Sequence, residues 1–188
     1  MTLNFNLMHT TALDEIVYIT GKDFGIKPIK HDRDPVVRLG ARGIVVNENR
    51  EIALLYKAKK KEYKLPGGGV DDGEDSTAAF QRECREELGC TIDIQQKLGV
   101  AVEYKSQENF KQLSFVYSAQ KVADLGKNSL TEKEKDEGAT VVWPPKLEAL
   151  EKMKFSIDAM QASEYDSIYR TKFMTLRDIK ILEYYINL

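Results

Sequence analysis

The chain has 188 residues, of which 42% are hydrophobic and 31% charged, and its formal net charge is −2. These values are typical of one soluble globular domain with its own core and small additions. The balanced charge argues against a nucleic-acid-binding surface, and the apolar runs are too short for a membrane span. The N-terminus lacks the basic and long apolar regions of a secretory signal. Two cysteines, Cys84 and Cys90, are poorly placed for a disulfide, which favours a reduced, cytoplasmic setting.

The first part of the chain is predicted to form strands. Residues 1–35 are interpreted as an N-terminal extension that holds one short strand over 15–20. Residues 36–46 form a longer strand-like stretch. A turn at Asn47-Glu48-Asn49 then leads into a second strand over 51–56, which predicts a β-hairpin.

A glycine-rich turn, Leu65-Pro66-Gly67-Gly68-Gly69, comes shortly before a predicted helix over 77–88. The proline and the three glycines let the backbone turn sharply and approach a ligand closely. Asp75 or Ser76 is the predicted N-cap of the helix. Residues spaced four apart give the helix one apolar stripe for a core. The stripe consists of Phe80, Cys84 and Leu88.

Three carboxylates lie beside that stripe, those of Glu83, Glu86 and Glu87. On an α-helix they span about 100° of arc, and they would repel one another unless a positive charge lies among them. Hard divalent cations such as Mg²⁺ take carboxylate and carbonyl oxygens, and they share them with substrate phosphates. The pattern therefore predicts a metal-binding edge beside the glycine-rich turn. A solvated acidic helix face is the alternative.

The remaining elements follow in chain order: strands over 91–103 and 113–122, a mobile polar loop over 124–137, a strand over 139–143, and a short helix over 147–153. Phe110 and Lys111 are expected near the turn between the first two strands. Residues 154–188 are interpreted as a C-terminal extension that is helical in its second half. The apolar content of both extensions suggests packing against the domain or contacts in a homodimer.

The run Gly68-x5-Glu74-x7-Arg82-Glu83-Cys84-x-Glu86-Glu87-x-Gly89-Cys90 resembles the signature of the Nudix hydrolase superfamily. All seven fixed positions of that signature, from Gly68 to Gly89, are filled. Members of that superfamily cleave a diphosphate linked to another moiety. The departures are Cys84 and Cys90, which stand where the family usually has a bulky aliphatic residue. The resemblance covers about residues 36–153, taken here as the Nudix domain. It implies an α/β fold, the Nudix-type α/β/α sandwich with a mixed β-sheet.

The resemblance also implies roles for the signature residues. The metal ligands, for Mg²⁺ or Mn²⁺, would be Gly68 through its carbonyl and the carboxylates of Glu83, Glu86 and Glu87. Glu74 would orient the helix or a water molecule, and Arg82 would pair with a signature glutamate and hold it in place. The general base stays open. The candidates are Glu86, Glu87, Glu134 and Glu137.

Substrate contacts are expected from residues outside the signature. Arg38 and Arg42 share one face of the first long strand, and their guanidinium groups suit phosphate oxygens, although exposed salt bridges are equally compatible with them. Tyr63 and Phe110 are candidates for stacking on a base, but core packing is the commoner fate of such residues. His9 and His31, outside the matched region, receive no role.

The implied function is metal-dependent hydrolysis of a phosphoanhydride bond, with a metal-activated water as the nucleophile. A (deoxy)nucleoside triphosphate, oxidised or not, is the default substrate, because residues 103–107 lack the proline that ADP-ribose-specific families typically carry. Motifs associated with NADH and coenzyme A specificity are not visible. The alternative function is a non-catalytic Nudix-fold nucleotide sensor or binding protein, but such proteins usually have eroded signatures, and this one keeps all its acids.

Overall fold

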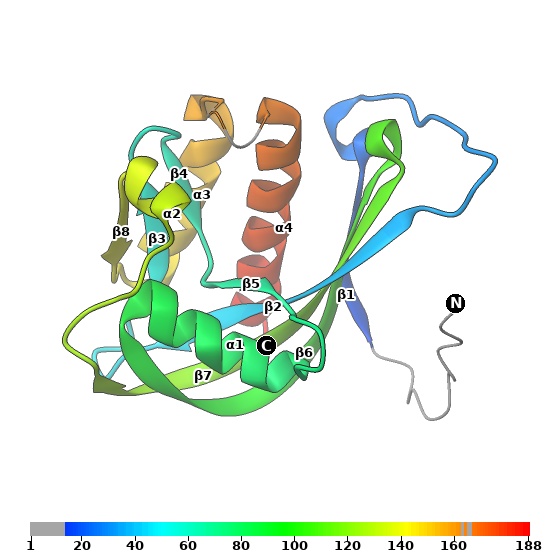
Figure 1. Cartoon of the computed structure of the whole chain (residues 1–188). Coiled ribbons are helices and arrows are strands. Elements are labelled where there is room, and N and C mark those ends of the chain that lie inside the picture. The colour runs from blue at the N-terminus through cyan, green and yellow to red at the C-terminus, as the bar shows by residue number, and fades with distance from the viewer. Residues whose placement is uncertain (1–13, 163, 165–166) are drawn as a thin grey trace.

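A mixed five-stranded sheet lies at the centre of the computed structural model, which describes residues 14–162, 164 and 167–188 (Figure 1). Its strands, in spatial order, are β1 (Glu15–Thr20), β6 (Cys90–Lys105), β7 (Phe110–Asp124), β2 (Val36–Val46) and β5 (Gly67–Gly69). The β1–β6 and β7–β2 pairs are parallel, and the other two are antiparallel. A second sheet has the order β4 (Glu62–Lys64), β3 (Leu54–Lys57) and β8 (Ala139–Val142).

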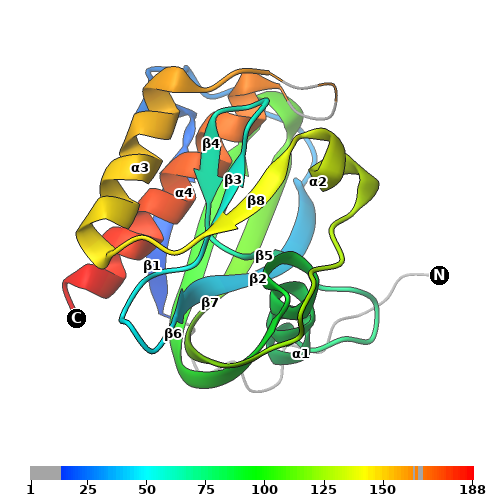
Figure 2. The same cartoon turned by 90° about the vertical axis from the view of Figure 1, so that its left-hand side faces the viewer.

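Helices cover both faces of the large sheet (Figure 2). On one face lie α1 (Ser76–Glu83) and η2 (Cys84–Leu88), and on the other lie α3 (Lys146–Ala159) and α4 (Ile168–Ile186). The short helix α2 (Glu132–Asp136) lies beside β8, and two 3₁₀ turns are η1 (Gly21–Phe24) and η3 (Ser106–Glu108). One core cluster lies between the sheet and α1, and it includes Phe80 and Cys84. The other lies between the sheet and the pair α3 and α4. The predicted α/β class with a mixed sheet is therefore confirmed.

The helix predicted over 77–88 changes its form after Glu83. Asp75, one of the two N-cap candidates, caps its start by accepting hydrogen bonds from two backbone N–H groups at 2.8 Å. The last five residues, η2, form a π-helix that ends at Gly89 with a φ of 66°. A π-helix bonds i to i+5, yet the predicted apolar stripe is still buried in one core cluster. Beside that stripe the Glu87 side chain is 3% exposed and the Glu86 side chain is 42% exposed.

Four other sequence expectations differ from the structure. The strand expected to start at 113 already starts at Phe110, so Phe110 and Lys111 lie beside the turn as predicted but within β7; η3 and Asn109, with a φ of 47°, make that turn. The loop expected over 124–137 contains α2, which Thr131 caps. The helix expected over 147–153 extends to Ala159, because the chain after Met153 continues without proline or glycine. The predicted hairpin is reduced to an isolated bridge between Val46 and Ile52, because β2 and β3 belong to different sheets and β3 begins only at Leu54.

β1 and α4 contribute to the core, although both lie outside the predicted domain 36–153. Ile19 of β1 and Phe173 of α4 have no solvent exposure. The Phe173 ring lies 5.0 Å from the rings of Phe24 and Tyr169. The division into extensions 1–35 and 154–188 and a domain 36–153 stays a prediction. In the structure, α4 from the second extension packs on the sheet. None of the helices in the described ranges has the length and apolar character that spanning a membrane would need.

Candidate active site

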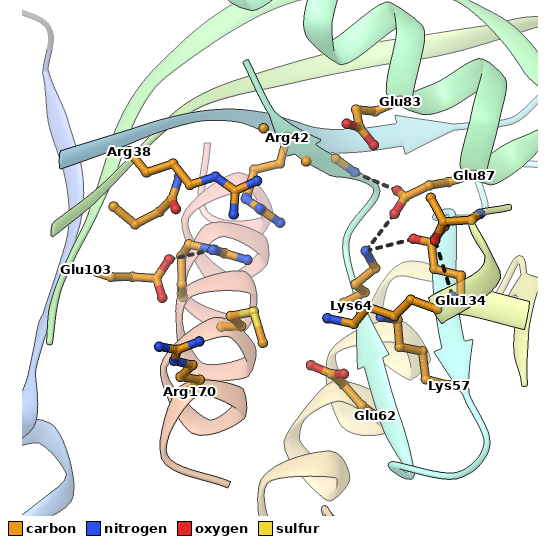
Figure 3. Close-up of a pocket in the computed structure, with 18 of the residues that line it drawn as sticks. Arg38, Arg42, Lys57, Glu62, Lys64, Glu83, Glu87, Glu103, Glu134 and Arg170 are labelled. Atoms are coloured by element: carbon orange, nitrogen blue, oxygen red, sulfur yellow. Dashed lines mark hydrogen bonds and ion pairs between the residues drawn. The ribbon is translucent and has the colours of Figure 1, made fainter. Parts of the chain in front are cut away.

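A cavity of about 460 Å³ is lined by residues of the large sheet, β4, α2, η2 and α4 (Figure 3). Eight lysine or arginine residues and six glutamates line it, so its walls carry a positive balance. A cleft with that balance favours an anionic ligand. The acids of the signature reach it from η2 and the end of α1, whereas most cations come from the strands and α4.

The glycine-rich turn packs directly against the signature helix. A Cβ on Gly68 would lie 2.3 Å from Oε1 of Glu83, and one on Gly69 would lie 2.8 Å from Nη2 of Arg38. Gly67 has a φ of 135°, a conformation that L side chains rarely adopt. Glycine at these positions therefore lets a carboxylate and a guanidinium approach the backbone closely.

Replacing Gly68 with alanine is expected to lower kcat of the hydrolysis that the signature implies roughly 10²-fold, because the added methyl displaces the Glu83 carboxylate by about 1 Å. Steady-state kinetics would measure this, with thermal unfolding showing that the fold survives. Gly126→Asn is a suitable control, since Gly126 has open space around it at a φ of 81°, which asparagine tolerates. A Gly68→Ala variant within threefold of the wild type would contradict the expectation.

Arg82 joins the signature residues into one hydrogen-bonded unit. Its Nε and Nη2 donate to the two carboxylate oxygens of Glu74 at 3.1 and 3.0 Å. Its Nη1 donates to Glu83 at 2.9 Å and to Glu86 at 3.1 Å, and its Nη2 also donates to the Gly69 carbonyl at 3.0 Å. The hydrogen bond from Arg82 lowers the pKa of Glu74, whereas burial raises the pKa of Glu83. Arg82 thus ties the glycine-rich turn to the helix.

Glu87 is held from two sides within the cavity wall. It accepts a hydrogen bond from the Gly67 N–H at 2.8 Å and one from Nζ of Lys64 at 2.6 Å. Burial raises the pKa of Glu87 to about 7, against the opposing effect of Lys64. Burial alone would lower the pKa of Lys64, but the carboxylates of Glu87 and Glu134 outweigh it and raise that pKa. Figure 3 shows Lys64 between these two acids.

The oxygen atoms that line the cavity are of the chemical type that a hard divalent cation binds. Glu83 and Glu87 line the cavity together with Gly68, and carboxylate and carbonyl oxygens are the ligands that Mg²⁺ takes. Across residues 14–162, 164 and 167–188, no three His, Cys, Asp or Glu side chains are already grouped to hold a metal ion. In this structure the carboxylate of Glu86 accepts a hydrogen bond from Arg82 at 3.1 Å, and that of Glu87 accepts one from Lys64 at 2.6 Å.

The structure brings some predicted site residues together and separates others. Arg38 and Arg42 both line the cavity, as does Phe110. Tyr63 does not line it: its ring stacks on Tyr56, with centroids 4.5 Å apart, and the pair borders a separate hollow beside α3.

The two loop acids considered as general bases occupy different places. Glu134 lines the cavity near Lys64, with 3.8 Å between their charged atoms. Glu137 is fully buried and accepts a hydrogen bond from Lys57 at 2.7 Å. Glu134 is therefore the loop acid that can reach a ligand in the cavity.

Several cavity residues were missed by sequence reasoning, notably Lys64, Glu103 and Arg177. Glu103 is fully buried on β6 and accepts hydrogen bonds from Lys105 at 2.7 Å and from Arg177 of α4. No signal in the sequence marks Arg177, because its helix carries other charged residues, such as Arg170, Lys172 and Lys180, beside the apolar stripe. Lys64 and Glu103 are equally unmarked.

Glu103→Gln is expected to destabilise the protein at neutral pH, and the loss should shrink in acid. Burial alone would raise the pKa of Glu103, but Arg177 and Lys105 outweigh it and lower that pKa to about 2, from an ordinary 4.5. A lowered pKa stabilises the fold above pH 4.5, and this contribution disappears as the pH falls from about 4.5 towards 2. We expect the substitution to lower the free energy of unfolding by about 3 kcal/mol at pH 7. Urea unfolding at pH 7 and at pH 3 measures the loss. An equal loss at both pH values would contradict the assignment.

Comparison with known proteins identifies the family. A model of the NUDIX domain matches residues 37–162 of this chain, a range that contains the whole signature and α3. The chain belongs to the Nudix family. Nudix proteins generally use a divalent metal, which agrees with the kind of oxygen donors in the cavity.

Two curated relatives match parts of the Nudix chain. One is a Bacillus subtilis (strain 168) protein provisionally named 8-oxo-dGTP diphosphatase, 39% identical over 69 residues, which are 37% of this chain and 46% of the relative. The other is the Mycolicibacterium smegmatis 8-oxo-(d)GTP phosphatase, 27% identical over 108 residues, which are 57% of this chain and 31% of the relative. The chain thus spans less than half of the length of each.

Two solved structures share the Nudix fold with this chain at low sequence identity. A NUDIX hydrolase from Nitrosomonas europaea superposes with a TM-score of 0.57 at 17% identity, covering 80% of this chain and 88% of that one. The E. coli ORF135 protein superposes with a TM-score of 0.54 at 18% identity, covering 82% and 91%. At such identities the likeness concerns the fold alone.

Proposed function

We propose that this Nudix protein is a divalent-metal-dependent hydrolase of a nucleoside diphosphate linked to another moiety. One observation carries the proposal: Glu83 and Glu87 of the signature face the same cavity as the glycine-rich turn and a set of arginines. Acids on one wall and guanidinium groups on another are what a diphosphate substrate needs, since its phosphates bind both a cation and arginines.

The signature residues hold the cation in this proposal. Its ligands are the carboxylates of Glu83, Glu86 and Glu87 and the Gly68 carbonyl. When bound, Mg²⁺ or Mn²⁺ supplies charge neutralisation on the phosphates and lowers the pKa of a water molecule. Arg82 fixes the orientation of Glu83 through its hydrogen bond at 2.9 Å.

The other residues act on the substrate and on protons. Arg38 and Arg42 line the cavity and bind phosphate oxygens through their forked donors. Glu134 or Glu87 accepts the proton of the attacking water, since both carboxylates lie at the cavity beside Lys64. Phe110, which also lines the cavity, is assigned to stacking on the base. The phosphoryl group is then transferred to water in line with the departing phosphate.

The proposed substrate is a (deoxy)nucleoside triphosphate, and an oxidised purine nucleotide is the first candidate. The names of the Bacillus and Mycolicibacterium relatives refer to 8-oxo-dGTP or 8-oxo-(d)GTP, which supports this choice. A third relative, named RNA pyrophosphohydrolase, is 32% identical over 50 residues, so a 5′-phosphorylated RNA end also belongs in the tests.

The test is release of phosphate or pyrophosphate from a substrate panel, with Mg²⁺ and with Mg²⁺ plus EDTA. The panel contains dNTPs, 8-oxo-dGTP, ADP-ribose, Ap4A, nucleotide sugars and a 5′-triphosphorylated RNA. We expect metal-dependent turnover that is highest for 8-oxo-dGTP or a dNTP. If only another panel member is turned over, the proposed nucleoside triphosphate substrate is wrong, and that member defines the substrate class. If the folded protein binds a nucleotide but turns over no member of the panel, the proposed enzymatic function is refuted and a nucleotide sensor takes its place.

A further inference from the structure

Helix α4 reaches the glycine-rich turn through one buried carboxylate. Asp178, with no solvent exposure, accepts a hydrogen bond from the Leu65 N–H at 3.1 Å through Oδ2. Its other oxygen accepts a hydrogen bond from Nε of Arg177 at 2.8 Å and lies 3.5 Å from Nη1 of Arg42. A single side chain of α4 therefore contacts the turn and two guanidinium groups at once.

Both guanidinium groups belong to the cavity wall. Arg42 and Arg177 line the cavity and are only 7% and 3% exposed. Arg42 contacts Ser114 at 3.4 Å besides Asp178, and Arg177 contacts Glu103 besides Asp178. These bonds use two of the five N–H donors that each guanidinium carries. The donors that remain lie on groups that border the cavity.

The charge of this cluster also favours an anion. Its three cations, Arg42, Arg177 and Lys105, stand against two carboxylates, Asp178 and Glu103. A buried group of charges with one excess cation is costly unless an anion completes it. Paired guanidinium donors match the oxygens of a phosphate group, and phosphate is the anion that the proposed substrate carries.

We propose that α4 completes the substrate site: Arg42 and Arg177 together bind a phosphate group of the substrate, and Asp178 is a positioning residue that aims both of them and fixes the glycine-rich turn. The inference rests on the proposed function, since it concerns the same cavity. Asp178 bonds the turn at Leu65, and Glu87 bonds it at Gly67, so the basic and acidic walls share one backbone support. Asp178 thereby sets the position of a bound phosphate relative to the signature acids.

Binding of inorganic pyrophosphate tests the anion site without catalysis. The full chain is titrated by calorimetry in metal-free buffer with EDTA. We expect Arg177→Gln and Arg42→Gln to weaken binding at least tenfold and Arg42→Lys, which keeps the charge but loses the fork, at least threefold. Lys180→Gln is the matched control on α4, because Lys180 lies 3.8 Å from Asp23 and does not line the cavity. It should bind within twofold of the wild type.

Kinetics of Asp178→Asn test the positioning role. Asparagine retains an oxygen for the Leu65 N–H but loses the charge that orients the two arginines. We expect kcat to fall at least tenfold while KM changes less than threefold, whereas Arg177→Gln should chiefly raise KM. A purely structural role for Asp178 would lower the thermal midpoint and leave both constants of the folded fraction unchanged.

The outcomes separate the inference from the proposed function. Wild-type pyrophosphate affinity in a folded Arg177→Gln or Arg42→Gln variant would overturn the inference even if the enzyme turns over nucleotides. If Arg177→Gln does not fold, the Arg42→Lys variant serves as the test, and wild-type pyrophosphate affinity in that variant would overturn the inference. Absence of pyrophosphate binding to the wild type also overturns it. Loss of binding in the arginine variants, without metal-dependent turnover of any panel member, would support the anion site and refute the hydrolase.

Discussion

The variant Glu87→Gln is expected to lose at least about 10²-fold in kcat, the scale on which a proton-transferring or charge-stabilising group contributes. Glutamine keeps an oxygen that can accept the Gly67 N–H, which Glu87 bonds at 2.8 Å, but it loses the charge needed for a cation and for Lys64. Glu86→Gln should show a comparable loss if Glu86 leaves Arg82 to become a ligand. The measurement is kcat at saturating Mg²⁺ and substrate.

The matched control for both variants is Glu132→Gln. Glu132 lies on α2 beside the cavity, but its side chain is 91% exposed and pairs only with exposed Lys135 among the described contacts. Its activity should stay within twofold of the wild type, and thermal unfolding should show all three variants folded. Glu86→Gln and Glu87→Gln variants that both retain full activity would refute the assignment of the signature acids.

Truncating the Phe173 side chain is the change with the largest expected effect on stability. Phe173→Ala should lower the free energy of unfolding by about 3–5 kcal/mol, the usual cost of removing a fully buried phenylalanine. The ring has no exposure, packs against Phe24 and Tyr169 at 5.0 Å, and has Nζ of Lys105 at 5.1 Å from its centroid. Urea unfolding with a shared m-value measures the difference.

Phe155→Ala on α3 is the control for Phe173→Ala. Its ring is 64% exposed, so its loss should change stability by about 0.5 kcal/mol or less. A loss below about 1 kcal/mol for Phe173→Ala would mean that α4 adds little to the core. Residues 154–188 could then be treated as a dispensable extension, and the role proposed for Asp178 would lose its structural basis.

The position of the signature acids beside the glycine-rich turn could be predicted because it depends on spacing within one short stretch. Local offsets place Gly68, Arg82 and Glu83 next to one another, and a helix with an N-cap at Asp75 keeps them there. Strands β1, β2, β6 and β7 were also expected from their residue patterns, with end positions that differ by a few residues.

The different surroundings of Glu86 and Glu87 could not be predicted in this way. Within the π-helical turn the Glu87 side chain is 3% exposed and that of Glu86 is 42% exposed, and Glu87 is covered by its contacts with Lys64 of β4 and Gly67 of β5. Tyr63 likewise turned away from the cavity, because β4 presents it to Tyr56 and α3. Neither outcome follows from the order of residues along a single element.

The sequence by itself determined the Nudix signature, the α/β class and the type of ligand the acids suit, since these depend on residues that are neighbours along the chain. Only the tertiary structure decided that Leu65, Arg42, Glu103 and Asp178 form one buried cluster. Leu65 and Asp178 are separated by 113 positions, and their bond exists because α4 packs across the sheet. Buried charges are stable only beside their partners, so the packing of α4 selects which arginines face the cavity.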